Sequence, residues 1–189
     1  MGDEVFMKLI DLIAPVSEKE FRTKILGRKP FVFQTTKYKT KFFSDIISWK
    51  QLSDYINNHR ASAGLQVITA KGDKRCMERG NLHIGDKPHW EKKDRYQVSE
   101  VFKVWQEGGS IILTKASMLT PNISAIAGCL EEAVANSACD AHFYCSQKVG
   151  ARSFDLHCDE DDNFLVHAIG EVHWQVFRKG SKTDCVIDK

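Results

Sequence analysis

The stretch SFDLHCDEDDNF, residues 153–164, contains the pattern on which the predictions of fold and function depend. His157 and Asp159 lie two positions apart, and successive side chains of an extended strand point to opposite faces, so these two share a face if the stretch is a strand. Two histidines and one carboxylate form the facial triad that holds non-haem Fe(II). The pair therefore predicts part of a metal site, and the competing interpretation is a chance pair within the acid run 159–162.

Around and beyond this pair, apolar and polar residues alternate in short segments that are separated by polar or glycine-containing connections. The predicted strands are HFYCS (142–146), RSFDLH (152–157), NFLVHAI (163–169), VHWQVFR (172–178) and DCVID (184–188). Short strands at close and even spacing are typical of an antiparallel barrel or sandwich. The C-terminal part of the chain, residues 139–189, is therefore predicted to form a β core.

Before residue 139 the apolar residues recur mostly at helical spacing. The predicted helices cover 5–13, 17–26, 49–58, 99–107 and a longer segment from Pro121, and the predicted strands in this part cover 28–34, 65–70 and 110–116. Helices followed by a run of strands define an α+β class. No flexible linker or internal repeat divides the chain, so we predict a single domain over 1–189, with a mainly helical scaffold over 1–138.

Four of the predicted helices begin at capping residues, one of them Ser99 at the start of the helix that runs through Glu107. Ser17 precedes Glu20 and Ser48 precedes Gln51 at the spacing of a capping box. Thr120 followed by Pro121 combines a capping hydroxyl with proline at the first helical position. These starts make the helical half the more strongly specified part of the sequence.

A polar segment, residues 71–97, is predicted to be a long irregular excursion. It contains His83 and His89, which are either solvated loop histidines or metal ligands. The sequence leaves both interpretations open.

The composition limits the classes of protein to which this chain can belong. With 42% hydrophobic residues among 189, the chain can bury a core, and its formal net charge of +2 does not favour direct nucleic-acid binding, although Lys and Arg cluster in the first half. The six cysteines show no C-x-x-C spacing. The acidic N-terminus does not resemble a signal peptide, and no apolar run has the length of a membrane span. We therefore expect a cytoplasmic protein with reduced thiols.

Long blocks of the sequence resemble the JmjC-type 2-oxoglutarate oxygenases, specifically the cupin-like branch called ribosomal oxygenases. The resemblance begins where Phe21 is followed by RKPFVF (28–33). It continues through SEVFKVWQEGGSIILTKASMLTPNISAIAGCLEEA (99–133). It is strongest in HFYCSQKVGARSFDLHCDEDDNFLVHAIGEVHWQVF (142–177), where a Tyr strand, His-x-Asp, a Phe strand and Gly-x-x-x-Trp follow in the family's order.

The resemblance implies a double-stranded β-helix and an enzyme that uses Fe(II) and 2-oxoglutarate to hydroxylate a protein side chain, with ribosomal proteins as candidate substrates. It implies that His157 and Asp159 are the first two iron ligands and the catalytic centre. Tyr144 and Ser146 are the candidate residues for binding the cosubstrate. Ribosomal oxygenases are commonly dimers, so a homodimer is one expected assembly.

The sequence departs from the family pattern at the third iron ligand, a His on a later strand of the barrel. After Asp159 the chain contains His167 and His173, and both come too early to match that position. The family places this ligand well beyond Lys189. We therefore expect the chain to hold only the first half of the barrel, as a truncated chain would.

A second departure lies at the basic residue that anchors the distal carboxylate of 2-oxoglutarate, because Val172 occupies that position. A valine cannot supply a charge-assisted hydrogen bond. Tyr144, Ser146, Lys148 and Arg178 remain open as substitutes. The alternative functions are a cupin-like binding module that has lost 2-oxoglutarate binding, or a cupin that uses another metal for different chemistry, such as an isomerase.

Overall fold

The computed structural model describes residues 7–58, 65–68, 74–75, 98–134, 137–148, 151 and 156–189. The elements in chain order are α1 (Leu9–Ile13), α2 (Glu18–Glu20), the π-helical turn η1 (Phe21–Ile25), α3 (Lys37–Ser44), α4 (Trp49–Asn58), β1 (Leu65–Ile68), β2 (Lys74–Arg75), α5 (Val98–Gln106), β3 (Ser110–Leu113), α6 (Pro121–Ala133), β4 (Phe143–Ser146), β5 (Gln175–Phe177) and β6 (Cys185–Asp188). The predicted excursion 71–97, with His83 and His89, lies outside the described residues except for β2.

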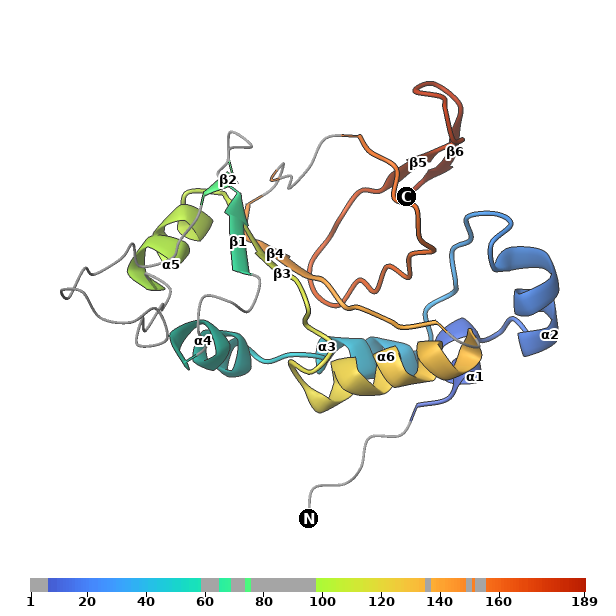
Figure 1. Cartoon of the computed structure of the whole chain (residues 1–189), viewed down its shortest axis with the longest axis horizontal. Coiled ribbons are helices and arrows are strands. Elements are labelled where there is room, and N and C mark those ends of the chain that lie inside the picture. The colour runs from blue at the N-terminus through green and yellow to red at the C-terminus, as the bar shows by residue number, and fades with distance from the viewer. Residues whose placement is uncertain are drawn as a thin grey trace, which may run out of the picture.

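Four strands form one antiparallel sheet in the order β2-β1-β3-β4. β3 lies in the middle, where Ile111 pairs with Val67 of β1 on one side and with Cys145 of β4 on the other. All four residues of β3 are buried, as expected for a continuous apolar run. Figure 1 shows α1, α3, α4 and α6 in a row on one side of this sheet, and α5 beside β1.

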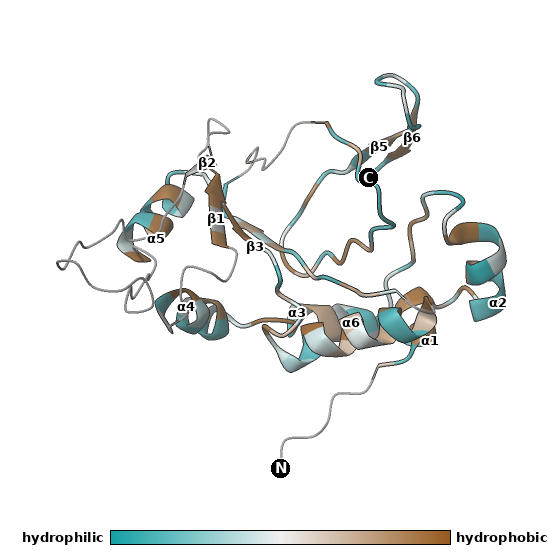
Figure 2. Cartoon of the chain, viewed as in Figure 1, coloured by the Kyte–Doolittle hydropathy of each residue, from teal (hydrophilic) through white to brown (hydrophobic). Residues whose placement is uncertain are grey.

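The core lies between the sheet and these helices. Side chains at alternate positions of the strands point toward it, including Val67, Ile111 and Leu113, which are fully buried. Figure 2 shows the hydrophobic colouring concentrated on β1 and β3, with hydrophilic residues on the outer sides of the helices. The opposite face of the sheet carries Tyr144 and Ser146 of β4.

Three of the four predicted helix starts are confirmed, whereas α5 begins at Val98, so Ser99 lies inside this helix and not at its cap. Ser17 accepts a hydrogen bond from the amide of Glu20, and the amide of Gln51 donates to Ser48 Oγ at 3.2 Å. Thr120 accepts from the Ile123 amide and donates its hydroxyl proton to the Ile46 carbonyl at 2.7 Å. The Thr120 side chain thus caps α6 and also ties it to the loop before α4.

Two predictions for the N-terminal half are wrong. Residues 28–34 are irregular rather than a strand, because Pro30 lacks an N–H for a ladder and the segment is fixed instead by packing of Phe33 on Phe21. Helix α3 was not predicted, since its sequence is polar and lysine-rich. Buried Lys39 stabilises it from within by donating from Nζ to the carbonyls of Ala14 and Gln34, 2.6 and 3.1 Å away.

The predicted strands of the C-terminal part do not all form. Segments 142–146, 172–178 and 184–188 contain β4, β5 and β6, whereas 163–169 is irregular and most of 152–157 lies outside the described residues. β4 joins the sheet of the helical half, across the predicted division at residue 138, and β5 pairs with β6 in a separate hairpin (Figure 1). The structure is thus mixed helix and sheet with small antiparallel sheets, and the double-stranded β-helix stays a prediction.

The end of α5 depends on two glycines, as the sequence predicted. Gly108 has φ +101° and donates to the Trp105 carbonyl, while Gly109 donates to the Val104 carbonyl, so the two form a Schellman motif. A Cβ on Gly109 would lie 2.4 Å from the Ile68 carbonyl oxygen of β1. The helix therefore packs on the sheet at a distance that only glycine permits.

We expect Gly109→Ala to lower the free energy of unfolding by about 2 kcal/mol, because the added methyl must displace backbone of β1 and α5. Gly128→Ala is the matched control, since a Cβ at this exposed position of α6 meets nothing within 4 Å and should raise stability by roughly 0.5–1 kcal/mol. Urea denaturation of both variants measures the difference. Equal stability of the two variants would contradict the close packing of α5 on β1.

Candidate functional site

Tyr144 and Ser146 lie on the same face of β4 because side chains alternate along a strand. Ser146 Oγ is 2.7 Å from Ser110 Oγ of β3, within hydrogen-bonding distance. This pair crosses the two strands at the register Ser110–Ser146. The Ser146 hydroxyl is therefore engaged within the sheet, whereas the Tyr144 side chain is about half exposed.

His157 and Asp159 lie in an irregular segment, not on the strand that would explain their common direction. Their side chains nevertheless face each other, with 3.7 Å between His157 Nε2 and Asp159 Oδ1. Both are exposed, with relative side-chain exposures of 57% and 55%. The two predicted metal ligands thus converge at the surface by loop conformation rather than by strand alternation.

Asn163 holds the Asp159 carboxylate in place. Its side-chain amide donates to Asp159 Oδ2 at 2.9 Å and lies 3.5 Å from the Asp161 carbonyl. The Asp159 carboxylate therefore presents Oδ1 to His157 while Oδ2 is occupied. The sequence did not predict this role of Asn163. The one feature that could have indicated it is the position of an amide side chain four residues after Asp159.

Phe164, the residue after Asn163, anchors the loop that carries His157 and Asp159 to the core. Phe164 packs on Phe21 of η1, with ring centroids 5.9 Å apart. The turn at Gly27 also approaches the loop, since a Cβ there would be 3.7 Å from Asp162 Oδ2. Asp162 of the acid run thus lies close to the turn after η1.

An electrostatic interaction links the loop to β4. Burial raises the pKa of the Tyr144 phenol above its ordinary value, and the negative charge of Asp159 raises it further. This interaction requires the two side chains to lie in one locality. The structure therefore brings together one predicted cosubstrate residue, Tyr144, and the predicted ligands His157 and Asp159.

The donors of this pair suit a transition metal in part. An ion that binds an imidazole nitrogen and a carboxylate oxygen at roughly 2.1 Å each holds them about 3.0–3.6 Å apart, so a separation of 3.7 Å needs only a small adjustment. Within the described ranges, no three His, Cys, Asp or Glu side chains gather in a group that could hold a metal ion. The residues present thus fit two positions of a facial triad.

The two later histidines are engaged elsewhere. His167 Nε2 lies 3.3 Å from the Ile169 carbonyl, and His173 pairs with Asp188 across the β5–β6 hairpin. The latter contact lowers the pKa of the Asp188 carboxyl. Both histidines therefore have partners outside the His157–Asp159 pair.

The expected anchor position remains apolar and exposed in the structure, at Val172. Among the proposed substitutes, Arg178 donates from Nε to Asp184 Oδ2 at 2.6 Å within its own hairpin. Ser146 is hydrogen-bonded to Ser110. Tyr144 lies within the field of the Asp159 carboxylate.

Comparison of the chain with protein-family models, with curated proteins and with solved structures found no match. The helices in the described part of the chain include none that is both long enough and apolar enough to cross a membrane.

We expect the phenol of Tyr144 to titrate above the ordinary tyrosine pKa of 10.0, and Asp159→Asn to lower this pKa, because a neutral amide no longer opposes the phenolate. The ultraviolet absorbance titration of the wild-type chain minus that of Tyr144→Phe isolates this phenol. Asp161→Asn neutralises another exposed carboxylate of the same run and serves as the control. A Tyr144 pKa unaffected by Asp159→Asn would mean that the two side chains lie apart.

Proposed function

We propose that this chain carries part of the active site of an Fe(II)- and 2-oxoglutarate-dependent dioxygenase that hydroxylates a protein side chain. The observation that carries the proposal is the convergence of His157 Nε2 and Asp159 Oδ1 to 3.7 Å. A nitrogen and a carboxylate oxygen are the ligand types of the facial triad. Ribosomal proteins are the candidate substrates, on the resemblance to the ribosomal oxygenases alone.

In this proposal each residue has a separate role. His157 and Asp159 hold the iron, which when bound supplies the activation of O₂ and the oxidation of the keto acid. Asn163 orients Asp159 through the hydrogen bond to Oδ2, as residues behind metal ligands commonly do. Tyr144 offers a phenol close to the site for the cosubstrate.

The second candidate function is a cupin-like binding module that has lost 2-oxoglutarate binding. It is favoured by one observation, the exposed and uncharged side chain of Val172 at the position of the carboxylate anchor. Without a cation or an array of donors, a dicarboxylate gains little from leaving water. The two functions differ in their response to the keto acid and not in their response to the metal.

For the oxygenase, we expect a chain extended beyond Lys189 to release succinate from 2-oxoglutarate when Fe(II) is added, and Asp159→Ala in this extended chain to lower the rate by about 100-fold or more, because a metal ligand is lost. Asp161→Ala removes an exposed carboxylate from the same run and should retain the activity. Mass spectrometry of the succinate measures turnover. Equal activity of Asp159→Ala and the wild-type chain would refute the proposed site, and a thermal shift with Mn(II) but none with added 2-oxoglutarate would favour the binding module.

The role of Asn163 is tested separately. We expect Asn163→Ala to weaken binding of Mn(II), a redox-stable substitute for Fe(II), by roughly 10–100-fold, because the Asp159 carboxylate is no longer oriented. Asn163→Asp also removes the amide donor but adds a second carboxylate beside Asp159, so it shows whether added negative charge near the metal can offset the loss of orientation. Isothermal titration calorimetry gives the affinities. Unchanged affinity in Asn163→Ala would contradict the orienting role.

A further inference from the structure

The segment 163–169 has the side-chain arrangement of a β-strand. Every second side chain is partly buried and packs against the core, namely Phe164, Val166 and Ala168. The side chains between them are exposed, namely Leu165, His167 and Ile169. Burial of every second residue is expected of an extended backbone, in which successive side chains point to opposite faces. One face of this segment therefore belongs to the core and the other faces solvent.

The segment has no partner strand among the described residues. It runs between β4 and β5 without joining either sheet (Figure 1). Within the described part of the chain, none of its backbone N–H and C=O groups is hydrogen-bonded to another backbone group. The ring of His167 lies 3.3 Å from the Ile169 carbonyl oxygen, a contact within the segment itself. The backbone groups of both edges are thus available to an added strand.

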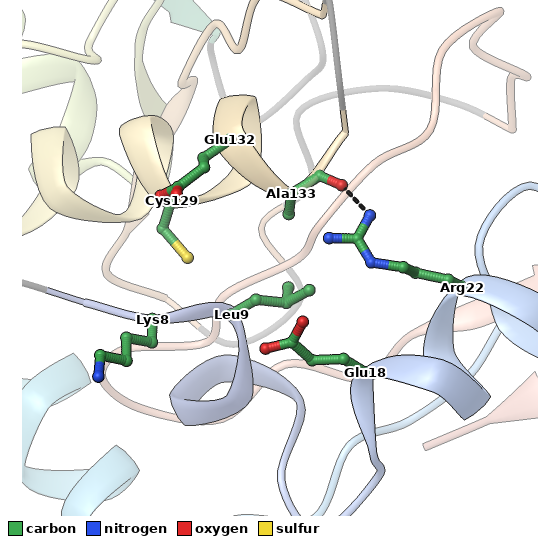
Figure 3. A pocket seen from close by; sticks show the side chains of 7 residues that line it. All are labelled: Lys8, Leu9, Glu18, Arg22, Cys129, Glu132 and Ala133. Atoms are coloured by element: carbon green, nitrogen blue, oxygen red, sulfur yellow. Dashed lines mark hydrogen bonds between the residues drawn. The ribbon is translucent and has the colours of Figure 1, made fainter.

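The segment lies on a fixed support. Phe164 packs on Phe21 of η1, and the neighbouring Arg22 donates from its guanidinium to the carbonyl of Ala133 at the end of α6. Figure 3 shows this hydrogen bond beside a cavity in the helical half, between α1, α2, η1 and α6. Because these contacts hold one face of the segment before a partner binds, less conformational entropy is lost on binding.

The exposed face of the segment carries large apolar side chains. Leu165 and Ile169 have relative exposures of 61% and 71%. Polar residues are expected on a strand face that is open to water. Apolar side chains at these alternate positions suit contact with the side chains of a neighbouring strand, which would lie directly beside them.

Carboxylates lie at both ends of the segment. Glu160, Asp161 and Asp162 precede it and Glu171 follows it, and all four are exposed. Among the residues that the structure describes, none of these four forms an ion pair. A strand with Lys or Arg near its ends would therefore complement the charge on both sides of the apolar face.

We propose that residues 163–169 bind an extended basic peptide of a partner protein, which adds to the segment as a β-strand. Backbone hydrogen bonds to one edge provide affinity, and alternate apolar side chains of the peptide pack beside Leu165 and Ile169. A second copy of this chain is a poorer partner, because antiparallel pairing of two such segments brings the acidic end of each beside Glu171 of the other. Binding needs no metal ion, so this inference is separate from the proposed oxygenase activity.

The probe is a fluorescein-labelled peptide amide of the sequence Lys-Lys-Val-Thr-Val-Thr-Val-Lys-Lys. We expect fluorescence anisotropy to show saturable binding to the wild-type chain without metal. The same peptide with N-methyl groups on two adjacent central residues loses a donor whichever edge it uses, and it should bind about tenfold more weakly or worse. Replacement of its four lysines by glutamate should weaken binding by a similar factor.

Each comparison can fail. No saturable binding of the basic peptide overturns the proposal. Equal binding of the N-methylated peptide overturns strand pairing, and equal binding of the glutamate peptide overturns the choice of a basic partner.

Amide hydrogen exchange followed by NMR identifies the paired edge. A strand pairs through one edge at a time, and only every second N–H points to that edge. We therefore expect saturating peptide to slow exchange at alternate amides of 163–169 and to leave the amides between them unchanged. Uniform or absent protection overturns strand addition. Alternate amides already protected in the free chain would mean that the segment pairs within the protein or with a second copy, which also overturns the proposal.

Two variants localise the binding. Ile169→Lys removes an apolar contact and places a positive charge beside the basic peptide, so it should weaken binding about tenfold. Met118→Lys makes the same kind of change at another exposed apolar side chain, outside the segment, and should leave the affinity unaltered. Circular dichroism melts verify that both variants fold. A folded Ile169→Lys variant with wild-type affinity contradicts the site.

Discussion

The hydrogen-bonded position of β3 between β1 and β4 is the constraint on which the rest of the structure depends. Four consecutive buried residues, Ser110–Leu113, pair on both edges with strands from distant parts of the sequence. Three of them are aliphatic, and burial of each such side chain is worth about 2 kcal/mol. Because β4 follows α6, this pairing fixes the place of Tyr144 in the sheet, opposite Ile112 of β3, and so sets where the candidate site can form.

The candidate site depends on a different kind of support. His157 and Asp159 are exposed and belong to no strand, so their convergence comes from the hydrogen bond of Asn163 to Asp159 and from the packing of Phe164 on Phe21. Loops that carry function are commonly held in this way by a few contacts to a rigid scaffold. The cavity in the helical half is lined by residues of the N-terminal segment from Lys8 to Arg22 together with residues of α6, which come much later in the chain.

The helical half could be predicted well because its signals are local. Thr120-Pro121 caps the first turn of α6, and Gly108-Gly109 supplies donors to the last carbonyls of α5. Both features are found as predicted. Helix α3 escaped prediction because its stabilising contact, from Lys39 to the Ala14 carbonyl, spans 25 positions. The segment 163–169 was predicted to be a strand because its apolar and polar residues alternate. Alternation does not show whether another strand is available to pair with it, and the segment is irregular in the structure.

The sequence by itself determined the capped starts of α2, α4 and α6, the glycine end of α5, the apolar strand β3 and the residue types of the candidate metal site, since these follow from local hydrogen bonding, burial and donor chemistry. Only the tertiary structure decided that β4 pairs with β3, that His157 faces Asp159 without a strand, and that Asn163 orients the carboxylate. It also decided that Arg22 and Glu132 line one cavity. These contacts join residues through space. Their geometry depends on how helices, strands and loops pack together, which the spacing of residues along the chain does not determine.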